Sequence, residues 1–278
     1  MNYYKYFCVR PGHRVRLKDY DPQFAAKHLD KKSALPKIEK LRETMDGLQF
    51  RLYAEQKRSL LICLQAPDAG GKDGIIRHVI GSMNPQSCRV ASFKQPSSEE
   101  LAHNFLWRIE RQTPKRGEVV IFNRSHYEDV LVVRVHDLVP KTVWSPRYEQ
   151  INDFERRLVA SGTHILKFFL HLSKEEQLRR FKQRLDDPAR RWKISEADYS
   201  ERRYWRQYET AYEDMLHKCS TQDAPWFVIP SDHKWFRNLV ISQIIVDTME
   251  NLRIQVPKPT VDISEIRRKY HQAAKGGN

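Results

Sequence analysis

An apolar run followed by a glycine-rich turn constrains the fold of this 278-residue chain more than any other feature. Residues 60–65 predict a buried strand, and apolar residues at helical spacing over 75–80 predict a helix. A strand, a glycine-rich turn with a lysine and a helix form a phosphate-binding loop, because backbone N–H groups and a helix N-terminus then face an anion. The turn reads Ala66-Pro67-Asp68-Ala69-Gly70-Gly71-Lys72-Asp73-Gly74.

The loop departs from the usual phosphate-loop pattern at two positions. Ala66 stands where the first glycine is expected, and Asp73 replaces the Ser or Thr that normally holds magnesium. With Asp68, Asp73 places two carboxylates beside the phosphates, and they would repel those phosphates unless a hard cation lay between them. We therefore expect Mg²⁺ as a cofactor, with Mn²⁺ as an alternative. The competing interpretation is a plain tight turn at Gly70–Gly71 with a solvated Lys72, but the flanking strand and helix favour the phosphate loop.

Length and composition are those of an ordinary globular protein. The chain can bury one sizeable core, and its content is 40% hydrophobic and 30% charged. No apolar run approaches the roughly 20 residues that span a bilayer, and the N-terminus lacks an apolar signal core. The four cysteines are scattered, so neither a disulfide framework nor a zinc site is indicated. We expect a cytoplasmic protein without membrane association.

The charge is strongly positive. There are 49 Lys and Arg residues against 35 Asp and Glu residues, a net charge of +14. A field of this sign attracts polyanions, and nucleic acid, an anionic membrane and polyphosphate all qualify. Basic residues gather between Lys5 and Lys18 and again between Arg179 and Lys193. A solvated surface is the alternative explanation of both runs.

Apolar strands alternate with helical patterns along the whole chain. This order predicts a parallel sheet with helices on both faces, in a single α/β domain over 1–278. Strands are expected over 60–65, 89–93, 119–122, 164–172 and 226–229. We expect helices over 37–58, 97–111, 144–160, 195–218 and 235–252, an irregular segment over 1–34 and a C-terminal extension over 256–278.

A second polar cluster follows the strand predicted over 119–122. Ligands of parallel sheets lie at the carboxyl ends of strands, so this cluster is expected to face the phosphate loop. Asn123 stands where an acidic residue usually anchors Mg²⁺, and Glu128 can supply the missing charge. Alternatively, Glu128 pairs with Ser125 in a helix-capping box. Arg124 is suited to neutralise charge on a transferring group.

Four further features have two interpretations each. The basic segment Arg190–Lys193 is either a lid that closes over phosphates or a solvated helix connection. Arg108, beside aromatic residues that indicate packing, can reach a substrate, and His126 is interpreted as structural or solvent-facing. An aromatic stripe at helical spacing indicates core packing in preference to a base-stacking platform. It consists of Trp205, Tyr208, Tyr212 and Met215.

Four motifs, in order along the chain, closely resemble the family-2 polyphosphate kinases. The resemblance runs from about residue 10 to residue 255, and Arg191-Trp192-Lys193-Ile194-Ser195 resembles the family's lid. The family usually has alanine where Gly70 stands and a bulky residue where Pro67 stands. The motifs are residues 65–74, Phe93-Lys94-Gln95-Pro96, Phe105-Leu106-Trp107-Arg108 and residues 122–135.

This resemblance implies a fold, a reaction and a set of partners. The fold is a P-loop kinase-like parallel sheet with a helical lid, carried by helices over about 174–218. The reaction is reversible, Mg²⁺-dependent transfer of the terminal phosphoryl group of inorganic polyphosphate to AMP and ADP, which gives ADP and ATP. Asn123 with Arg124 and Glu128 resembles the branch that accepts both nucleotides. A homo-oligomer is expected, and nucleic acid is not expected as a partner.

The resemblance also implies roles for individual residues. Asp68, Lys72 and Arg124 are expected to take part in catalysis. Asp68, Asp73 and Glu128 are expected to hold the metal ion. Phosphate and nucleotide contacts are expected from Ala69, Gly70, Gly71, Asp73, Gly74, Arg108, Arg191 and Lys193.

Two other functions compete with this one. An ATP-dependent nucleotide kinase of the thymidylate-kinase type shares the loop and the lid. A nucleic-acid-binding protein would use the basic surface, but no helix-turn-helix, ribonucleoprotein or zinc-finger signature is present.

Overall fold

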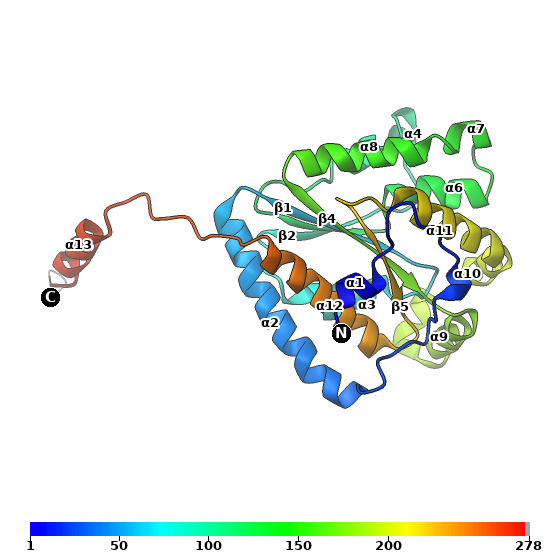
Figure 1. The fold of residues 1–278 in the computed structure, drawn as a ribbon, viewed down its shortest axis with the longest axis horizontal. Coiled ribbons are helices and arrows are strands. Elements are labelled where there is room, and N and C mark those ends of the chain that lie inside the picture. Colours follow the sequence, from blue (N-terminus) through cyan, green and yellow to red (C-terminus); the bar gives the residue numbers. More distant parts are fainter. Residues whose placement is uncertain (276–278) are drawn as a thin grey trace.

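Five parallel strands form the centre of the computed structural model, which describes residues 1–275 (Figure 1). Their order across the sheet is β2-β3-β1-β4-β5, so β1 lies in the middle with β3 and β4 as parallel neighbours. The predicted α/β class and all five predicted strands are confirmed. The strands are β1 (Ser59–Gln65), β2 (Cys88–Ser92), β3 (Val119–Asn123), β4 (Thr163–His171) and β5 (Trp226–Pro230).

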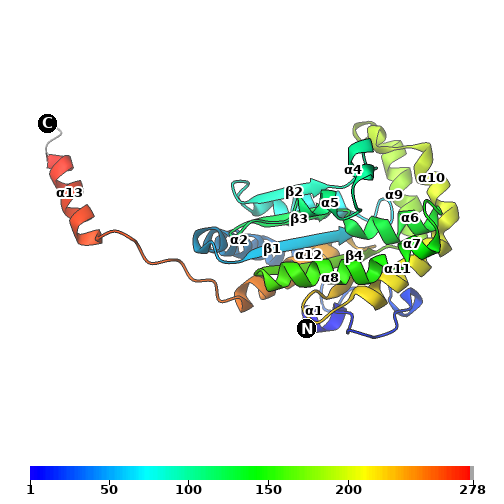
Figure 2. The same ribbon diagram turned by 90° about the horizontal axis from the view of Figure 1, so that it is seen from above.

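Helices cover both faces of the sheet, as Figure 2 shows. On one face, α2 (Lys31–Glu55) lies beside α12 (Lys234–Asn251), and both pack against alternate residues of β1 such as Ile62. On the other face, residues such as Leu61 pack with α8 (Arg147–Ala160). Because the central strands are buried on both faces, they are apolar at nearly every position.

The N-terminal segment is more ordered than the predicted irregular stretch over 1–34. A short helix, α1 (Tyr3–Phe7), packs its aromatic rings against Phe236 of α12. Helix α2 begins six residues before its predicted start, because Asp30 forms a capping box with Ser33 and extends the helix through a polar first turn. Apolar periodicity could not predict that first turn, because its residues are mostly polar.

Two predicted helices are broken into shorter ones. The helix expected over 97–111 is α4 (Ser98–Ala102) and α5 (Trp107–Glu110), because the Asn104 side chain accepts a hydrogen bond from the Leu106 N–H and forms a turn. The helix expected over 195–218 is α10 (Glu196–Glu201), a 3₁₀ turn and α11 (Trp205–Cys219).

Short helices and turns connect the remaining elements. The helices are α3 (Lys72–His78), α6 (Val132–Val135), α7 (Lys141–Trp144), α9 (Lys174–Asp186) and α13 (Ile263–Lys275). The 3₁₀ turns are Leu17–Asp19, Ile80–Ser82, His126–Val130, Pro188–Lys193 and Arg202–Tyr204.

The chain leaves the sheet after α12 and runs to α13, which lies apart from the rest of the molecule (Figure 1). All residues of α13 are exposed. The last part of the predicted C-terminal extension, 276–278, lies outside the described residues. Within residues 1–275, every helix is too short or too polar to cross a membrane.

Candidate active site

The turn after β1 has the backbone geometry of an anion-binding loop. Ala69 (φ 59°) and Gly71 (φ 107°) adopt left-handed conformations, and the Gly70 N–H donates to the Pro67 carbonyl at 2.9 Å. Successive turns of this kind curl the backbone around a concave space. Gly71 is the N-cap residue of α3, so the helix begins where the loop ends.

Lys72 is the first residue of α3 and folds back over the loop. Its Nζ donates to the Ala66 carbonyl at 3.2 Å. Burial and the nearby Arg124 guanidinium lower the pKa of Lys72, whereas the carboxylates of Asp68 and Glu128 act in the opposite direction. The ammonium group is therefore held at the mouth of the loop, within a cluster of both charge signs.

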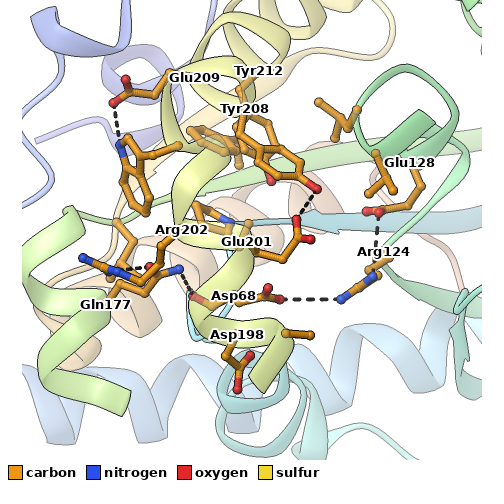
Figure 3. A pocket seen from close by; sticks show the side chains of 18 of the residues that line it. Asp68, Arg124, Glu128, Gln177, Asp198, Glu201, Arg202, Tyr208, Glu209 and Tyr212 are labelled. Carbon is orange, nitrogen blue, oxygen red and sulfur yellow. Dashed lines mark hydrogen bonds and ion pairs between the residues drawn. The ribbon is translucent and has the colours of Figure 1, made fainter. Parts of the chain in front are cut away.

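Arg124 lies between two carboxylates at the carboxyl ends of β1 and β3 (Figure 3). Its Nη2 is 3.6 Å from Asp68 Oδ1, and its Nη1 is 3.8 Å from Glu128 Oε2. Burial raises the pKa of Glu128, and the positive charges of Arg124 and Lys72 oppose this effect. The structure thus brings together the three residues expected in catalysis, with Glu128 beside them.

The capping-box interpretation of Glu128 is wrong. Ser125 Oγ accepts from the Tyr127 N–H at 3.3 Å, but the Glu128 carboxylate does not accept from the Ser125 N–H, so the two residues form no capping box. The turn that follows is a 3₁₀ turn, His126–Val130, in which the third residue does not reach back to the cap. The Glu128 side chain instead lines a cavity. Its role as a metal or substrate contact stays a prediction.

Asp73 joins the loop to the segment predicted as a lid. Its Oδ2 accepts from Lys193 Nζ at 3.0 Å, and its Oδ1 accepts from Asn123 Nδ2 at 3.3 Å. Burial raises the pKa of Asp73, but the Lys193 ammonium and the other donors outweigh this and leave it lowered. Lys193 is thus at the loop, whereas Trp192 beside it is 78% exposed.

Two of the arginines predicted to contact phosphate or nucleotide do not line the cavity. Arg108 donates to the Lys94 carbonyl at 2.8 Å, and Arg191 donates to the Leu185 carbonyl at 2.9 Å. Neither arginine lines the cavity. The expected metal ligands do not form a closed cluster either: within residues 1–275, no group of three acidic, histidine or cysteine side chains is arranged to hold a metal ion. Asp73 pairs with Lys193, whereas Asp68 and Glu128 lie beside Arg124.

A cavity of about 490 Å³ opens beside the loop. Asp68, Arg124 and Glu128 line one part of it, and α10 and α11 form the opposite wall (Figure 3). Tyr208 and Tyr212 stack with ring centroids 6.1 Å apart. The cavity therefore has Asp68, Arg124 and Glu128 on the side of the loop and aromatic rings on the side of α11, where Glu201 and Glu209 also line it.

The aromatic stripe is only partly core packing. Met215 and Tyr212 are buried in the core, as predicted, but Tyr212 also lines the cavity together with the half-buried Trp205 and Tyr208. The bend between α10 and α11 presents these rings to the open space. His126 is fully buried and lies 3.1 Å from Glu155 Oε1, so its structural interpretation is confirmed.

The comparisons with known proteins agree with this geometry. Residues 28–257 match the family described as polyphosphate kinase 2 (PPK2). The chain belongs to this family. The resemblance inferred from four sequence motifs is therefore confirmed, and the matched residues make up most of the chain.

Relatives and a solved PPK2 structure match over nearly the whole length. The AMP/ADP-polyphosphate phosphotransferase of Meiothermus ruber is 50% identical over 256 residues, which are 92% of this chain and 96% of the relative. The ADP-polyphosphate phosphotransferase of Rhodopseudomonas palustris is 44% identical over 272 residues, covering 92% and 93% of the two chains. The crystal structure of polyphosphate kinase 2 from Arthrobacter aurescens TC1 superposes with a TM-score of 0.92 at 39% identity, covering 95% of each chain.

Several residues around the PPK2 site escaped sequence reasoning. Gln177, Arg180 and Arg237 donate hydrogen bonds to carbonyls of the phosphate loop from more than 100 positions away along the chain. Glu201 accepts from Tyr208 Oη at 2.9 Å and lies 3.0 Å from His136 Nε2 at the cavity wall. No local pattern marks these side chains, because only the packing of α9–α12 brings them to the site.

Proposed function

We propose that this protein transfers the terminal phosphoryl group of inorganic polyphosphate to AMP and ADP. The observation that carries the proposal is that Arg124 and Asp68, beside the phosphate loop, line a cavity of about 490 Å³ that aromatic side chains of α11 also line. The names of the M. ruber and R. palustris relatives support polyphosphate as donor and adenine nucleotides as acceptors. The reaction is reversible, so its direction depends on substrate concentrations.

The transfer needs positioning and charge neutralisation more than covalent chemistry. A terminal phosphate oxygen of the acceptor attacks the terminal phosphorus of polyphosphate, and the anhydride P–O bond breaks to release a chain one phosphate shorter. No strong general base is required, because the attacking oxygen is already ionised. Lys72 and the loop N–H groups hold phosphate oxygens, and Arg124 neutralises charge on the transferring group.

The aromatic interior of the cavity suits the nucleoside of the acceptor. Tyr208, Tyr212 and Trp205 of α11 line the cavity, and a base stacked on an aromatic side chain gains about 1–3 kcal/mol. Arg124 and Glu128 at the other part of the cavity would then lie toward the nucleotide phosphates. This arrangement directs the acceptor's terminal phosphate to the loop.

Mg²⁺ is the proposed cofactor, with Mn²⁺ as an alternative. Asp68 and Glu128 would hold it, since both carboxylates lie within 4 Å of the same guanidinium and supply oxygen donors. Magnesium usually takes one or two carboxylates together with waters and substrate phosphates, so it needs no closed cluster of protein ligands. Bound there, it would neutralise phosphate charge. Chelation with EDTA should abolish turnover, and added Mg²⁺ or Mn²⁺ should restore it.

A time course without ATP tests the function. Long-chain polyphosphate, Mg²⁺ and AMP are incubated with the enzyme, and anion-exchange chromatography follows the nucleotides. Successive formation of ADP and ATP is expected. ATP formed from ADP alone would restrict the acceptor to diphosphates. Activity only with ATP as donor would support the thymidylate-kinase-type alternative, and DNA binding without turnover would support the nucleic-acid alternative.

Assembly and location stay predictions. A homo-oligomer and a cytoplasmic protein that does not bind nucleic acid are expected from the resemblance and the composition. Light scattering on the purified chain tests the first of these expectations.

A further inference from the structure

Three consecutive carbonyl groups of the phosphate loop accept hydrogen bonds from side chains outside the loop. The Asp68 carbonyl accepts from Gln177 Nε2 at 2.9 Å, and the Ala69 carbonyl accepts from Arg180 Nη1 at 2.8 Å. The Gly70 carbonyl accepts from Arg180 Nη1 at 3.1 Å and from Arg237 Nη1 at 3.3 Å. The loop is therefore held from α9 and α12 through its backbone.

These bonds decide which way the loop N–H groups point. In a planar trans peptide the C=O and the following N–H point in opposite directions. Fixing the carbonyls of Asp68 and Gly70 toward α9 and α12 therefore turns the N–H groups of Ala69 and Gly71 the other way. Neither N–H has a hydrogen-bond acceptor among the residues that the structure describes. They are free to donate to a phosphate.

Arg237 is packed directly under the glycines of the loop. It is 2% exposed, and a Cβ added at Gly71 would lie 1.9 Å from its Nη1. A Cβ at Gly74 would lie 3.0 Å from its Nη2. A glycine is thus required at position 71, both because φ is positive there and because a side chain would clash with the guanidinium group of Arg237.

The Arg237 guanidinium has an unusual set of partners for a buried cation. Its side-chain acceptor is the neutral Asn238 Oδ1, at 2.9 Å from Nη2, and Arg237 forms no ion pair with a carboxylate within residues 1–275. Burial and the neighbouring Arg180 charge lower the pKa of Arg237 to about 9. A buried cation without an anionic partner is costly, which indicates a purpose other than stability.

We propose that Arg237, together with Arg180, is a positioning residue for phosphoryl transfer. The two guanidinium groups fix the peptides around Gly70 so that the Ala69 and Gly71 N–H groups are preorganised for the donor phosphates. Arg237 acts through the loop and does not contact the reacting atoms. The inference rests on the proposed function, because it takes the loop's ligand to be a phosphate chain.

The test compares Arg237→Met and Arg237→Lys with a matched control, Arg89→Met. Arg89 also donates to two backbone carbonyls, those of Gln112 and Thr113 at 2.9 and 3.1 Å, but on β2 at the edge of the sheet. Arg237→Met removes both the charge and the guanidinium donors to Gly70 and Asn238, whereas Arg237→Lys keeps a positive charge and one donor. The measurements are kcat, the KM values for AMP and polyphosphate, and the rise in Tm on adding tripolyphosphate.

Arg237→Met is expected to lower kcat at least tenfold and to remove most of the tripolyphosphate-induced rise in Tm. The KM for AMP should change less than twofold, because the cavity walls are untouched. Arg237→Lys should be intermediate in kcat. Arg89→Met should lower Tm without the ligand but keep wild-type kcat and a wild-type tripolyphosphate shift.

Wild-type kcat and tripolyphosphate shift in Arg237→Met would overturn the proposal. So would equal losses of kcat in Arg237→Lys, Arg237→Met and Arg89→Met, since these would indicate a general packing effect. Failure of the proposed function would look different, because the wild-type enzyme itself would then show neither polyphosphate turnover nor a tripolyphosphate shift.

Discussion

The phosphate loop and the turn after β3 leave neighbouring strands at the same edge of the sheet, but they are held by different kinds of contact. The loop is held through its backbone, by hydrogen bonds from Arg180 and Arg237 to its carbonyls. The turn is held through its side chains: Tyr127 Oη donates to Glu155 at 2.8 Å, and His126 Nε2 lies 3.1 Å from the same oxygen.

A buried ion pair completes the anchor of the turn. Lys167 Nζ lies 2.5 Å from Glu155 Oε2 and donates to Tyr127 Oη at 2.9 Å and to the Cys219 carbonyl at 2.7 Å. The side chains of Lys167 and Glu155 are at most 1% exposed. Burial raises the pKa of Glu155, but the Lys167 charge and the His126 hydrogen bond outweigh this and leave it lowered.

The difference follows from what each segment presents to a ligand. The loop presents backbone N–H groups, so the orientation of its peptide planes must be fixed directly. The turn presents the side chains of Arg124 and Glu128. Anchoring the side chains of His126 and Tyr127 in the core is therefore sufficient to hold it in place. Changes in the turn's anchor should therefore affect stability first, whereas changes in the loop should affect turnover first.

The largest effect is expected from Glu155→Gln, which leaves the Lys167 charge buried without an anionic partner. Loss of one partner of a buried pair costs about 3–5 kcal/mol of unfolding free energy. Urea denaturation at pH 7 measures it, with Asp153→Asn as the control. Asp153 pairs with Arg156 on the same helix, but both side chains are exposed, so its loss should cost less than about 1 kcal/mol.

The pH dependence of this first effect has a definite sign. The folded pKa of Glu155 is lowered from 4.5, so its ionised form stabilises the protein above that pH, and the contribution is lost as pH falls through the folded value. The difference in stability between wild type and Glu155→Gln should therefore narrow below pH 4.5. A difference that widens in acid would contradict the role of the Glu155 charge.

Lys72→Ala is expected to lower turnover by roughly 10²–10³-fold, about 2.7–4 kcal/mol, because it removes a charge aimed at the phosphates. The midpoint of urea denaturation should stay near that of wild type, since Lys72 makes a single hydrogen bond to Ala66. Steady-state kinetics with polyphosphate and ADP measure the loss. Lys182→Ala, a side chain 74% exposed on α9, serves as control. Wild-type turnover in Lys72→Ala would remove it from the site.

Gly70→Ala tests how tightly the loop is packed. The added Cβ would lie 2.4 Å from the Ala66 Cβ and 2.8 Å from the Pro67 carbonyl oxygen, and such overpacking costs about 1–3 kcal/mol. The family usually has alanine at this position, and Ala66 occupies the position of the first glycine in the phosphate-loop pattern. The double change Ala66→Gly, Gly70→Ala should therefore recover part of the loss in Tm and kcat, because it removes the contact with the Ala66 Cβ but leaves the contact with the Pro67 carbonyl. Additive losses in a double-mutant cycle would contradict this exchange of one methyl group.

Glu128→Ala is expected to have the smallest effect, a loss of activity about tenfold greater with AMP than with ADP, or ~1.4 kcal/mol. Its carboxylate lines the cavity beside Arg124, on the side where we propose that the acceptor phosphates lie, and the two acceptors differ by one phosphate. The ratio of kcat/KM for AMP and ADP measures the effect. Glu128→Gln should behave in the same way if the charge matters. Equal losses with both nucleotides in both variants would assign Glu128 a structural role.

Local sequence was sufficient to predict the loop and the sheet. The apolar residues of β1, the glycines that follow and the helix after them are adjacent in the chain, so their geometry is encoded within about 20 residues. The carboxyl-end rule for parallel strands then placed Arg124 and Glu128 beside Asp68 without knowledge of the full fold. Helix boundaries were less well predicted, because the Asn104 turn and the Asp30 cap depend on single polar side chains.

The sequence by itself therefore predicted the residues of the candidate site: a phosphate loop with its lysine, two carboxylates and an arginine. Only the tertiary structure decided how that chemistry is supported. Arg180 and Arg237 reach the loop from α9 and α12, and Tyr208 faces the cavity because α10 and α11 meet at a bend. The physical reason is range: turns and caps form between neighbours in the chain, whereas a buried guanidinium finds its carbonyl partner only after helices distant in sequence have packed onto one sheet.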